Sequence, residues 1–331
     1  IMRDVDWGWL IRYMHSTGAS FFFIVIYLHM YRAMLYGSYK KPRELLWIFG
    51  MVIYLTLMAE AFFGYLLPWG QMSYWGAQVI ISLFSALPFI GEELSLFIRG
   101  DFVVSDVTLN RFFSFHVIAI PLIICGLVAA HIISLHEVGS NNPDGVEIKS
   151  QKDANGIPLD GIPFHPYYTL KDIVGVVVFL IFFVAVIFFS PEMGGYFLEH
   201  ANFVPANPLK TPDHIAPVWY FTPFYAILRA IPSQLGGVIA MGLSTTIFFL
   251  LPWLDRSPVK SIRYRGWNYK IALAAFTVSF IALGWLGMQP ATTTYTWMAR
   301  FFTAVYFAFF IFMPFYTKND SDKPIPERLT S

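Results

Sequence analysis

The chain has 331 residues, of which 56% are hydrophobic, 19% are aromatic and only 13% are charged, and its formal net charge is +1. Soluble domains carry about 25% charged residues, so this composition excludes an ordinary soluble protein and predicts an integral membrane protein whose first partner is the lipid bilayer. A net charge so close to zero argues against nucleic acid as a partner. The single cysteine, Cys125, excludes an intrachain disulfide and a covalent c-type haem, so any iron–sulfur centre must lie on another subunit.

Seven apolar runs are long enough, at about 20 residues, to cross a bilayer as helices, which predicts an all-α fold, a polytopic bundle of membrane helices. The predicted spans are 9–36, 45–67, 111–136, 170–190, 235–254, 267–287 and 297–316. Lysine and arginine concentrate in the first, third and fifth connections and in the C-terminal tail. By the positive-inside rule these segments face the cytoplasm, and seven spans satisfy the rule without exception. The second and fourth connections then lie outside, where we expect short surface helices and walls for a flat apolar ligand.

Two pairs of histidines lie within these spans. His15 and His29 are 14 positions apart in the first span, and His116 and His131 are 15 apart in the third. At 100° and ~1.5 Å per residue, the members of each pair lie on roughly one helix face, about 21–23 Å apart. Both spans run from outside to inside, so His15 matches His116 near the outer surface and His29 matches His131 near the inner surface. Four imidazoles at two matching depths can supply both axial ligands to two haems, whereas one such histidine alone is more often a hydrogen-bonded interhelical residue.

Arginines and glycines near the histidines fit the same interpretation. Arg12, Arg32 and Arg111 lie close to histidines in the sequence and suit the propionates of a haem, although arginines also snorkel to the membrane interface without any such role. Gly50 and Gly64 in the second span repeat the interval of 14 residues. Glycine leaves room for a flat macrocycle, although small residues in membrane helices also serve helix packing.

Segments along nearly the whole chain resemble one family, the cytochrome b of the cytochrome bc complex. They are RYMHSTGAS, YLHMYR, GYLLPWGQMSYWGA, RFFSFHVIAIP, AAHIISLHEVGSNNP, IPFHPYYTLKD, PVWYFTPFYAILRAIPSQLGG and LGWLGMQP. The resemblance implies a bacterial form of a complex III subunit in the inner (cytoplasmic) membrane, with two non-covalent haems b. Ubiquinol would be oxidised at an outer site and quinone reduced at an inner site, which contributes to a proton gradient.

The resemblance also implies an organisation and a set of partners. The family has eight transmembrane helices, of which this chain would supply the second to the eighth and lack the first. A di-haem domain would cover 1–165, and a C-terminal domain over 166–331 would complete the outer quinol pocket. The implied partners are a Rieske-type iron–sulfur subunit, a c-type cytochrome and a second copy of the complex in a homodimer.

Individual residues take roles from the same resemblance. His15 and His116 would ligate the outer haem iron, and His29 and His131 the inner one. Residues expected to contact the haems are Arg12, Gly18, Arg32, Gly50, Gly64 and Arg111. Residues expected to wall the outer quinol pocket are Tyr65, Pro68, Trp69, Gly76, Pro217, Trp219 and Tyr220. The inner quinone site would use His136, Ser140, Lys171 and Asp172, where an imidazole and a carboxylate suit proton delivery to a reduced quinone.

The chain departs from the family pattern at three places. The spacing of 15 in the third span is one more than in mitochondrial relatives, and it rotates His131 by ~100° unless the helix relaxes near Pro121. The stretch 146–161 looks like an insertion in the inner loop. The outer motif, usually Pro-Glu-Trp-Tyr, has Val218 in place of its glutamate.

Valine at position 218 leaves quinol oxidation without the expected proton acceptor. Glu60, eight residues before Pro68 in LTLMAEAFFGYLLPWG, is the candidate substitute. Desolvation there would hold its carboxyl ready to take up a proton near neutral pH. The alternative is a structural carboxyl that is hydrogen-bonded to a neighbouring helix or an arginine.

Two other classes of function remain open from the residues alone. A transporter or channel could use the histidines as a proton relay without haem. A di-haem anchor subunit of a dehydrogenase would bind the haems but lack an outer quinol pocket. A visible spectrum would distinguish a haem-free transporter from a haem protein, because only bis-histidine haem b has sharp visible bands. The segments PWGQ and PVWY, which suit an outer quinol pocket, argue against the anchor subunit.

Overall fold

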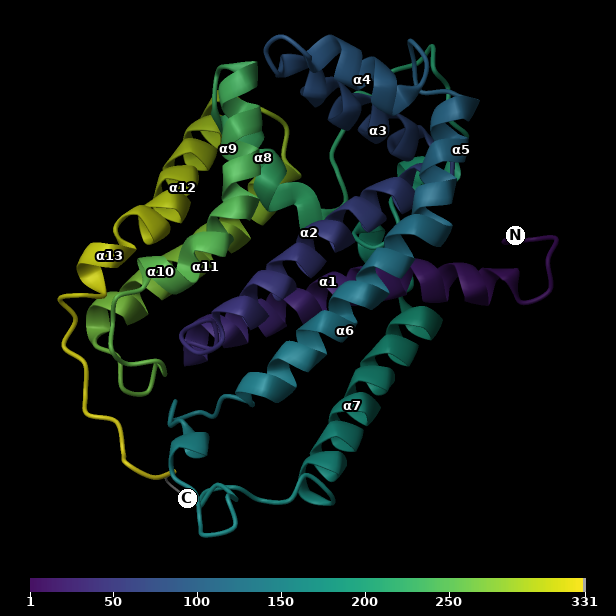
Figure 1. Ribbon diagram of the computed structural model, residues 1–331. Coiled ribbons are helices and arrows are strands. Elements are labelled where there is room, and N and C mark those ends of the chain that lie inside the picture. The colour runs from purple at the N-terminus through teal and green to yellow at the C-terminus, as the bar shows by residue number, and fades with distance from the viewer. Residues whose placement is uncertain (330–331) are drawn as a thin grey trace.

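The computed structural model describes residues 1–329, which form helices joined by loops (Figure 1). Within this range the only β-type pairings are two isolated bridges, Gly70 with Pro205 and Lys152 with Pro158. The predicted all-α class is therefore confirmed.

Each of the seven predicted spans corresponds to a helix or to a run of joined helices. Four spans are single helices, namely α1 (Gly8–Tyr36), α2 (Glu44–Leu66), α7 (Tyr167–Phe189) and α11 (Trp267–Gly287). The third span is a joined run of α5 (Asp106–Ser114), the π-helical η2 (Phe115–Ala119) and α6 (Ile120–Val138), and the fifth joins α9 (Gln234–Thr246), η7 (Ile247–Leu250) and α10 (Leu251–Leu254). In the last span α12 (Thr293–Ile311) is followed by α13 (Met313–Tyr316).

Six of these segments are long and apolar enough to cross a membrane. The seventh, α12, is a helix of 19 residues but is not among the six. The reason is visible in its first two turns, TTYTWMAR, where three threonines and Arg300 lower the hydropathy. The chain is thus a multi-pass helical membrane bundle, and the crossing by its last long helix stays a prediction.

Short helices occupy the two connections for which they were expected. The second connection holds α3 (Gln71–Leu83), η1 (Phe84–Ala86) and α4 (Gly91–Arg99), which lie together at one end of the bundle in Figure 1. The fourth holds η4 (Met193–Gly195), η5 (His200–Phe203), η6 (Trp219–Phe221) and α8 (Thr222–Ala230). One further turn, η3 (Ile148–Ser150), lies in the polar loop after α6.

The long helices form two groups that share one aromatic core. In the first group α2 packs against α6 and α1 against α7, and in the second α8, α9, α11 and α12 pack together. Phe23 of α1 stacks on Tyr220 with ring centroids 3.9 Å apart, and the Trp47 indole of α2 donates to the carbonyl of Phe248 at 2.8 Å. These buried contacts fix α1 and α2 against the second group, and the histidines of α1 are positioned by them.

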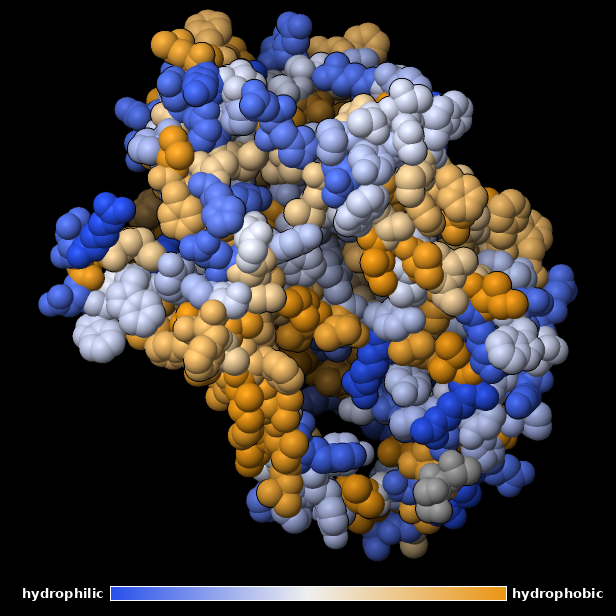
Figure 2. Space-filling model, turned by 180° about the vertical axis from the view of Figure 1, so that it is seen from behind, coloured by the Kyte–Doolittle hydropathy of each residue, from blue (hydrophilic) through white to orange (hydrophobic). Residues whose placement is uncertain are grey.

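Helix α7 stands at the edge of the bundle and exposes most of its side chains. Figure 2 shows apolar side chains as a column on the face where this helix lies. Its contact with α1 is aromatic, since Phe21 packs edge-on against Phe179 and Phe183. A helix that is apolar all round and mostly exposed is one that meets lipid.

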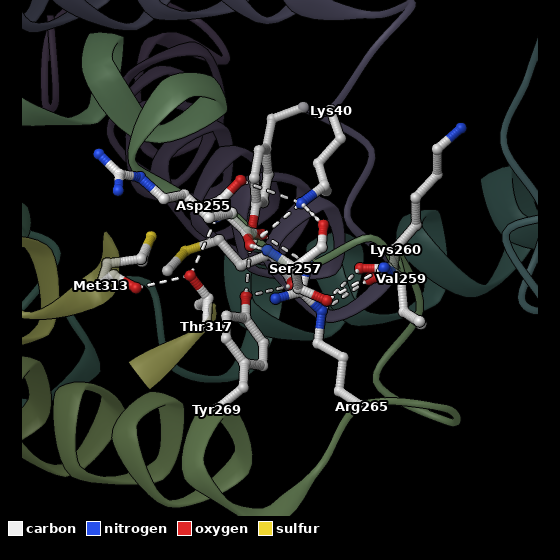
Figure 3. A network of polar contacts seen from close by, with 12 residues as sticks. Lys40, Asp255, Ser257, Val259, Lys260, Arg265, Tyr269, Met313 and Thr317 are labelled. Atoms are coloured by element: carbon white, nitrogen blue, oxygen red, sulfur yellow. Dashed lines mark hydrogen bonds and ion pairs between the residues drawn. The ribbon is translucent and has the colours of Figure 1, made fainter. Parts of the chain in front are cut away.

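A buried charged cluster ties the first connection to the connection before α11 (Figure 3). The carboxylate of Asp255 accepts from Tyr39 at 2.6 Å, forms an ion pair with Lys40 at 3.0 Å and a second ion pair with Arg265. Lys40 also donates to the carbonyl of Ser257 at 2.7 Å. Burial opposes ionisation, but the charges of Arg265 and Lys40 outweigh it and hold the pKa of Asp255 below its usual range.

Candidate haem and quinone sites

The outer histidines face each other across the first helix group. The rings of His15 on α1 and His116 in η2 have centroids 6.0 Å apart at an interplanar angle of 83°. Both line one cavity of about 590 Å³. The Nδ1 of His116 lies 2.9 Å from the backbone carbonyl oxygen of Glu60, which leaves Nε2 as the nitrogen without this contact.

The inner histidines repeat this arrangement at the other end of the same helices. The rings of His29 on α1 and His131 on α6 have centroids 6.4 Å apart at an interplanar angle of 67°. The pairing predicted from the sequence, His15 with His116 and His29 with His131, is therefore the spatial pairing.

The ring separations fit two axial ligands of one metal. Bonds from a metal to imidazole nitrogen are about 2.0–2.1 Å, so two imidazoles on opposite sides of one ion have centroids about 6 Å apart. The described residues contain no group of three or more His, Cys, Asp or Glu side chains that could hold a bare ion. Two imidazoles alone leave most coordination positions of a metal unfilled, an arrangement that fits the axial ligands of a haem better than a site for a bare ion.

The π-helical segment accounts for the unusual spacing in the third span. Segment η2, Phe115–Ala119, contains His116 and ends two residues before Pro121. A π-bulge inserts one residue into an α-helix without breaking it. The extra residue between His116 and His131 is absorbed there, and the predicted relaxation of the helix near Pro121 is confirmed.

Two glycines of α2 lie against the two histidines of the third span. A Cβ added at Gly64 would lie 2.3 Å from Cε1 of His116, and one added at Gly50 would lie 3.3 Å from Cε1 of His131. A Cβ at Gly18 would meet nothing within 4 Å. Gly50 and Gly64 therefore have a steric role beside the imidazoles, whereas the structure gives Gly18 no close neighbour.

The three arginines expected at the haems differ in their surroundings. Arg12 lines the outer cavity, one turn from His15. Arg111 is engaged elsewhere, because its guanidinium donates to the carbonyl of Phe97 and lies 5.8 Å from the centroid of that ring on α4. Arg32 is exposed, one turn after His29.

The residues expected to wall one quinol pocket divide between two cavities. Tyr65, Pro68 and Tyr220 line the cavity that also contains the outer histidines. Gly76 and Pro217 line a second cavity of about 420 Å³ on the other face of α2. The expectation of a single pocket is corrected here: helix α2 separates the two spaces, because residues on its opposite faces line different cavities.

The two tryptophans expected in the pocket line neither of these cavities. Trp219 turns its indole toward α1, where it donates to the hydroxyl of Ser20 at 3.1 Å. Trp69 packs edge-on against Tyr74, with ring centroids 5.5 Å apart. Both side chains support the walls rather than face the space.

The second cavity is almost entirely apolar. Its lining is drawn mainly from α2, α3, η6, α8 and α9 and includes Met58, Phe62, Phe63, Val79, Ile80, Phe221, Phe224, Tyr225, Leu228 and Met241. Several of these residues lie in the segments LTLMAEAFFGYLLPWG and PVWYFTPFYAILRAIPSQLGG, but sequence reasoning did not single them out, because nothing in the sequence shows which apolar side chains of a segment face a common space. A flat apolar ring with a hydrocarbon tail is the ligand that such a cavity suits.

The carboxylates of the outer cavity come from different elements. Glu60 on α2 places its carboxylate 3.0 Å from Nδ1 of His116. Glu199, in the connection before η5, lines the same cavity beside Val218. Sequence reasoning found Glu60 from its place in a helix but missed Glu199, which gives no signal other than being one of few acidic residues in that connection.

The residues expected at the inner quinone site do not line either large cavity. Two of these residues accept hydrogen bonds through their backbone carbonyls. Lys149 donates to the carbonyl of His136 at 3.4 Å, and Arg43 donates to that of Ser140 at 3.3 Å. Lys171 lies over the ring of Tyr168 at 5.7 Å. The inner site therefore stays a prediction.

Comparisons with known proteins agree with this geometry. The sequence model of the family described as "Cytochrome b/b6/petB" matches residues 1–139, and that described as "Cytochrome b(C-terminal)/b6/petD" matches residues 205–307. The first match contains both histidine pairs and the second contains Pro217 to Tyr220. The expected domain boundary at 165/166 falls between the two matches and stays a prediction.

Relatives extend over the whole chain. It is 65% identical over 339 residues to a cytochrome b of Allochromatium vinosum, which covers 100% of this chain and 82% of that protein. It is 53% identical over 331 residues to a cytochrome b of Rickettsia bellii, which covers 99% and 80%. A solved chain titled "Hyperthermophilic respiratory Complex III" is 40% identical with a TM-score of 0.88 and covers 96% of this chain and 81% of that one.

Proposed function

Because this chain belongs to the cytochrome b family and is a subunit of quinol–cytochrome c oxidoreductase, we propose that it holds two haems b between an outer quinol site and an inner quinone site. Electron transfer in a quinol-oxidising respiratory complex is its general role. The two haems, the two sites and the proton gradient that they support are the specific proposal.

The observation that carries the proposal is the repetition of one ligand arrangement at two levels. Ring centroids of 6.0 Å and 6.4 Å separate the outer and the inner pair, and a glycine of α2 faces one imidazole of each. A proton relay needs neither the paired spacing nor the glycines. The proposed iron ligands are His15 and His116 outside and His29 and His131 inside.

Residues around the outer histidine pair are proposed to orient one histidine and to bind a haem propionate. The carbonyl of Glu60 accepts from Nδ1 of His116 and so fixes the ring with Nε2 available for iron. Arg12, in the cavity wall, is placed to pair with a propionate. When bound, the haems supply one-electron transfer across the membrane.

The quinol site is proposed for the apolar cavity behind α2, with Pro217 and Tyr225 in its wall. The Glu60 carboxylate is proposed to receive a proton of the quinol, in the absence of an acid at position 218. On the inner side, His136 and Asp172 are proposed to supply protons to reduced quinone.

The remaining proposals concern the assembly. Of the two electrons of quinol, one is proposed to pass to the haems of this chain. The other is proposed to pass to an iron–sulfur subunit of the Rieske type and a c-type cytochrome, because a chain with a single cysteine cannot itself hold an iron–sulfur cluster or a covalent c-type haem. We also propose that the complex is a homodimer and that it resides in a bacterial inner membrane.

Visible spectroscopy of the purified complex tests the haem proposal. We expect two haems b per chain, with loss of the outer haem in His15→Ala or His116→Ala and of the inner haem in His29→Ala or His131→Ala. Loss of the same haem from the His15 and His29 variants would contradict the pairing. A parental complex without haem bands would instead favour a proton transporter.

A further inference from the structure

The apolar cavity proposed for quinol offers no good proton acceptor. The described residues that line it include no carboxylate, imidazole or amine, and its polar side chains are Tyr225 and Thr245. Both hydroxyls already donate, Tyr225 to the carbonyl of Ile215 at 3.2 Å and Thr245 to that of Gly242 at 2.9 Å. Oxidation of quinol releases two protons, so an acceptor outside this cavity is required.

Two carboxylates line the neighbouring histidine cavity, and they differ in what holds them. Glu60 lies 3.0 Å from a proposed iron ligand, His116. Glu199 is held instead by Asn202, whose amide donates to the Glu199 carboxylate at 3.2 Å. Asn202 is itself fixed, because its side-chain oxygen accepts from the backbone N–H of Ser73 at 2.8 Å. Glu199 is therefore a carboxylate on a rigid support that is independent of the haem ligands.

The same asparagine connects Glu199 to the wall between the two cavities. Its amide also donates to the hydroxyl of Tyr65 at 3.0 Å, so one NH₂ group holds a phenol and a carboxylate side by side. The Tyr65 ring reaches Gly76, where an added Cβ would lie 3.7 Å from its Cε1. Gly76 lines the apolar cavity and Tyr65 lines the histidine cavity. Tyr65 thus spans the boundary between the two spaces, with Glu199 on the far side.

Val218 lines the histidine cavity at the same boundary, and its neighbour Pro217 lines the apolar one. A carboxylate at position 218 would line the histidine cavity, but valine can neither accept nor donate a proton. Glu199 lines the same cavity as Val218 and, unlike Glu60, is not in contact with a proposed iron ligand.

On the basis of the proposed function, in which Glu60 receives one of the two protons of quinol, we propose that Glu199 is the carboxylate that accepts the other proton, and that Asn202 is the residue that positions it. In this step one quinol O–H bond breaks and one O–H bond forms on the Glu199 carboxylate. The two electrons leave to the one-electron acceptors of the complex, a haem on this chain and the high-potential partner. His200, the next residue, is exposed to solvent.

The surroundings of Glu199 suit a group that takes and releases protons near neutral pH. Burial raises the pKa of Glu199 to about 8. The other titratable or charged groups lining the cavity are Arg12 and His15 of α1, Glu60 and Tyr65 of α2, His116 of η2 and Tyr220 of η6. Because a base acts in its deprotonated form, the rate of quinol oxidation is expected to rise with pH around this value.

The test uses the intact complex with Glu199→Gln, Glu199→Asp and the control Glu192→Gln. Glu192 lies in the same connection but lines neither cavity. We expect Glu199→Gln to slow quinol oxidation about 10²-fold, a typical loss for a general base, and to abolish the rise with pH. Glu199→Asp keeps a carboxylate and should retain at least about a tenth of the rate. Glu192→Gln should match the parent.

Infrared difference spectra recorded on quinol oxidation provide a readout that does not depend on turnover. The protonated-carboxyl band should be equally strong in the parent and in Glu192→Gln and weaker in Glu199→Gln, which keeps only the contribution of Glu60. Adding Val218→Glu to Glu199→Gln should restore rate. The proposal is overturned if Glu199→Gln keeps the parental rate, pH profile or infrared band, or if the Asp and Gln variants lose equal activity. Failure of the proposed function would appear differently, as a parent complex without bis-histidine haem spectra.

Discussion

The contact between Gly64 and His116 makes a quantitative prediction about haem binding. A Cβ at Gly64 would lie 2.3 Å from Cε1 of His116, whereas one at Gly50 would lie 3.3 Å from Cε1 of His131. Ordinary carbon contacts begin at about 3.5 Å, so Gly64→Ala must move the His116 ring by about 1.2 Å and Gly50→Ala must move that of His131 by about 0.2 Å. Metal–ligand distances tolerate about 0.2 Å.

We therefore expect Gly64→Ala to weaken binding of the outer haem at least about tenfold and Gly50→Ala to leave both haems in place. The assay is the ratio of haem to protein in the purified complex, together with a redox titration that resolves the two haems as separate steps. Gly50→Ala is the matched control, because it makes the same chemical change on the same helix. Two fully bound haems in Gly64→Ala, or equal losses from the two variants, would refute the steric reasoning.

Further expectations concern the carboxylates. Glu60→Gln should slow quinol oxidation strongly and leave both haem spectra intact, and adding Val218→Glu should restore part of the rate. Stopped-flow reduction of the haems measures this, and a parental rate in Glu60→Gln would contradict the proposed role of Glu60. Asp255→Asn should destabilise the chain by about 3–5 kcal/mol, because it leaves Lys40 and Arg265 buried without their counter-charge, and thermal unfolding in detergent measures this. Because the pKa of Asp255 is lowered in the folded chain, its stabilisation is complete above the usual carboxyl range and should be lost as pH falls below about 4, whereas Asp255→Asn should remove this part of the acid sensitivity.

Much of the fold and the haem site was predictable because both follow from local regularities. Apolar runs of about 20 residues define helices in a bilayer, since every backbone polar group there must be satisfied within the helix. The intervals between His15 and His29 and between His116 and His131 place ligands on helix faces by geometry alone. Even the disturbance near Pro121 could be predicted, because an odd spacing must be absorbed somewhere in the helix.

The sequence by itself therefore determined the class of the protein, its helices and the pairing of its histidines, which are properties of single segments and their spacing. The tertiary structure alone decided which residues share a cavity, because that depends on how distant connections pack. Helix α2 separates the cavity of the outer histidines from the cavity lined by Pro217, Trp219 turns away toward Ser20, and a loop residue, Glu199, lines the same cavity as Val218. No periodicity predicts such contacts, because they arise from side chains of separate segments that meet only when the bundle has assembled.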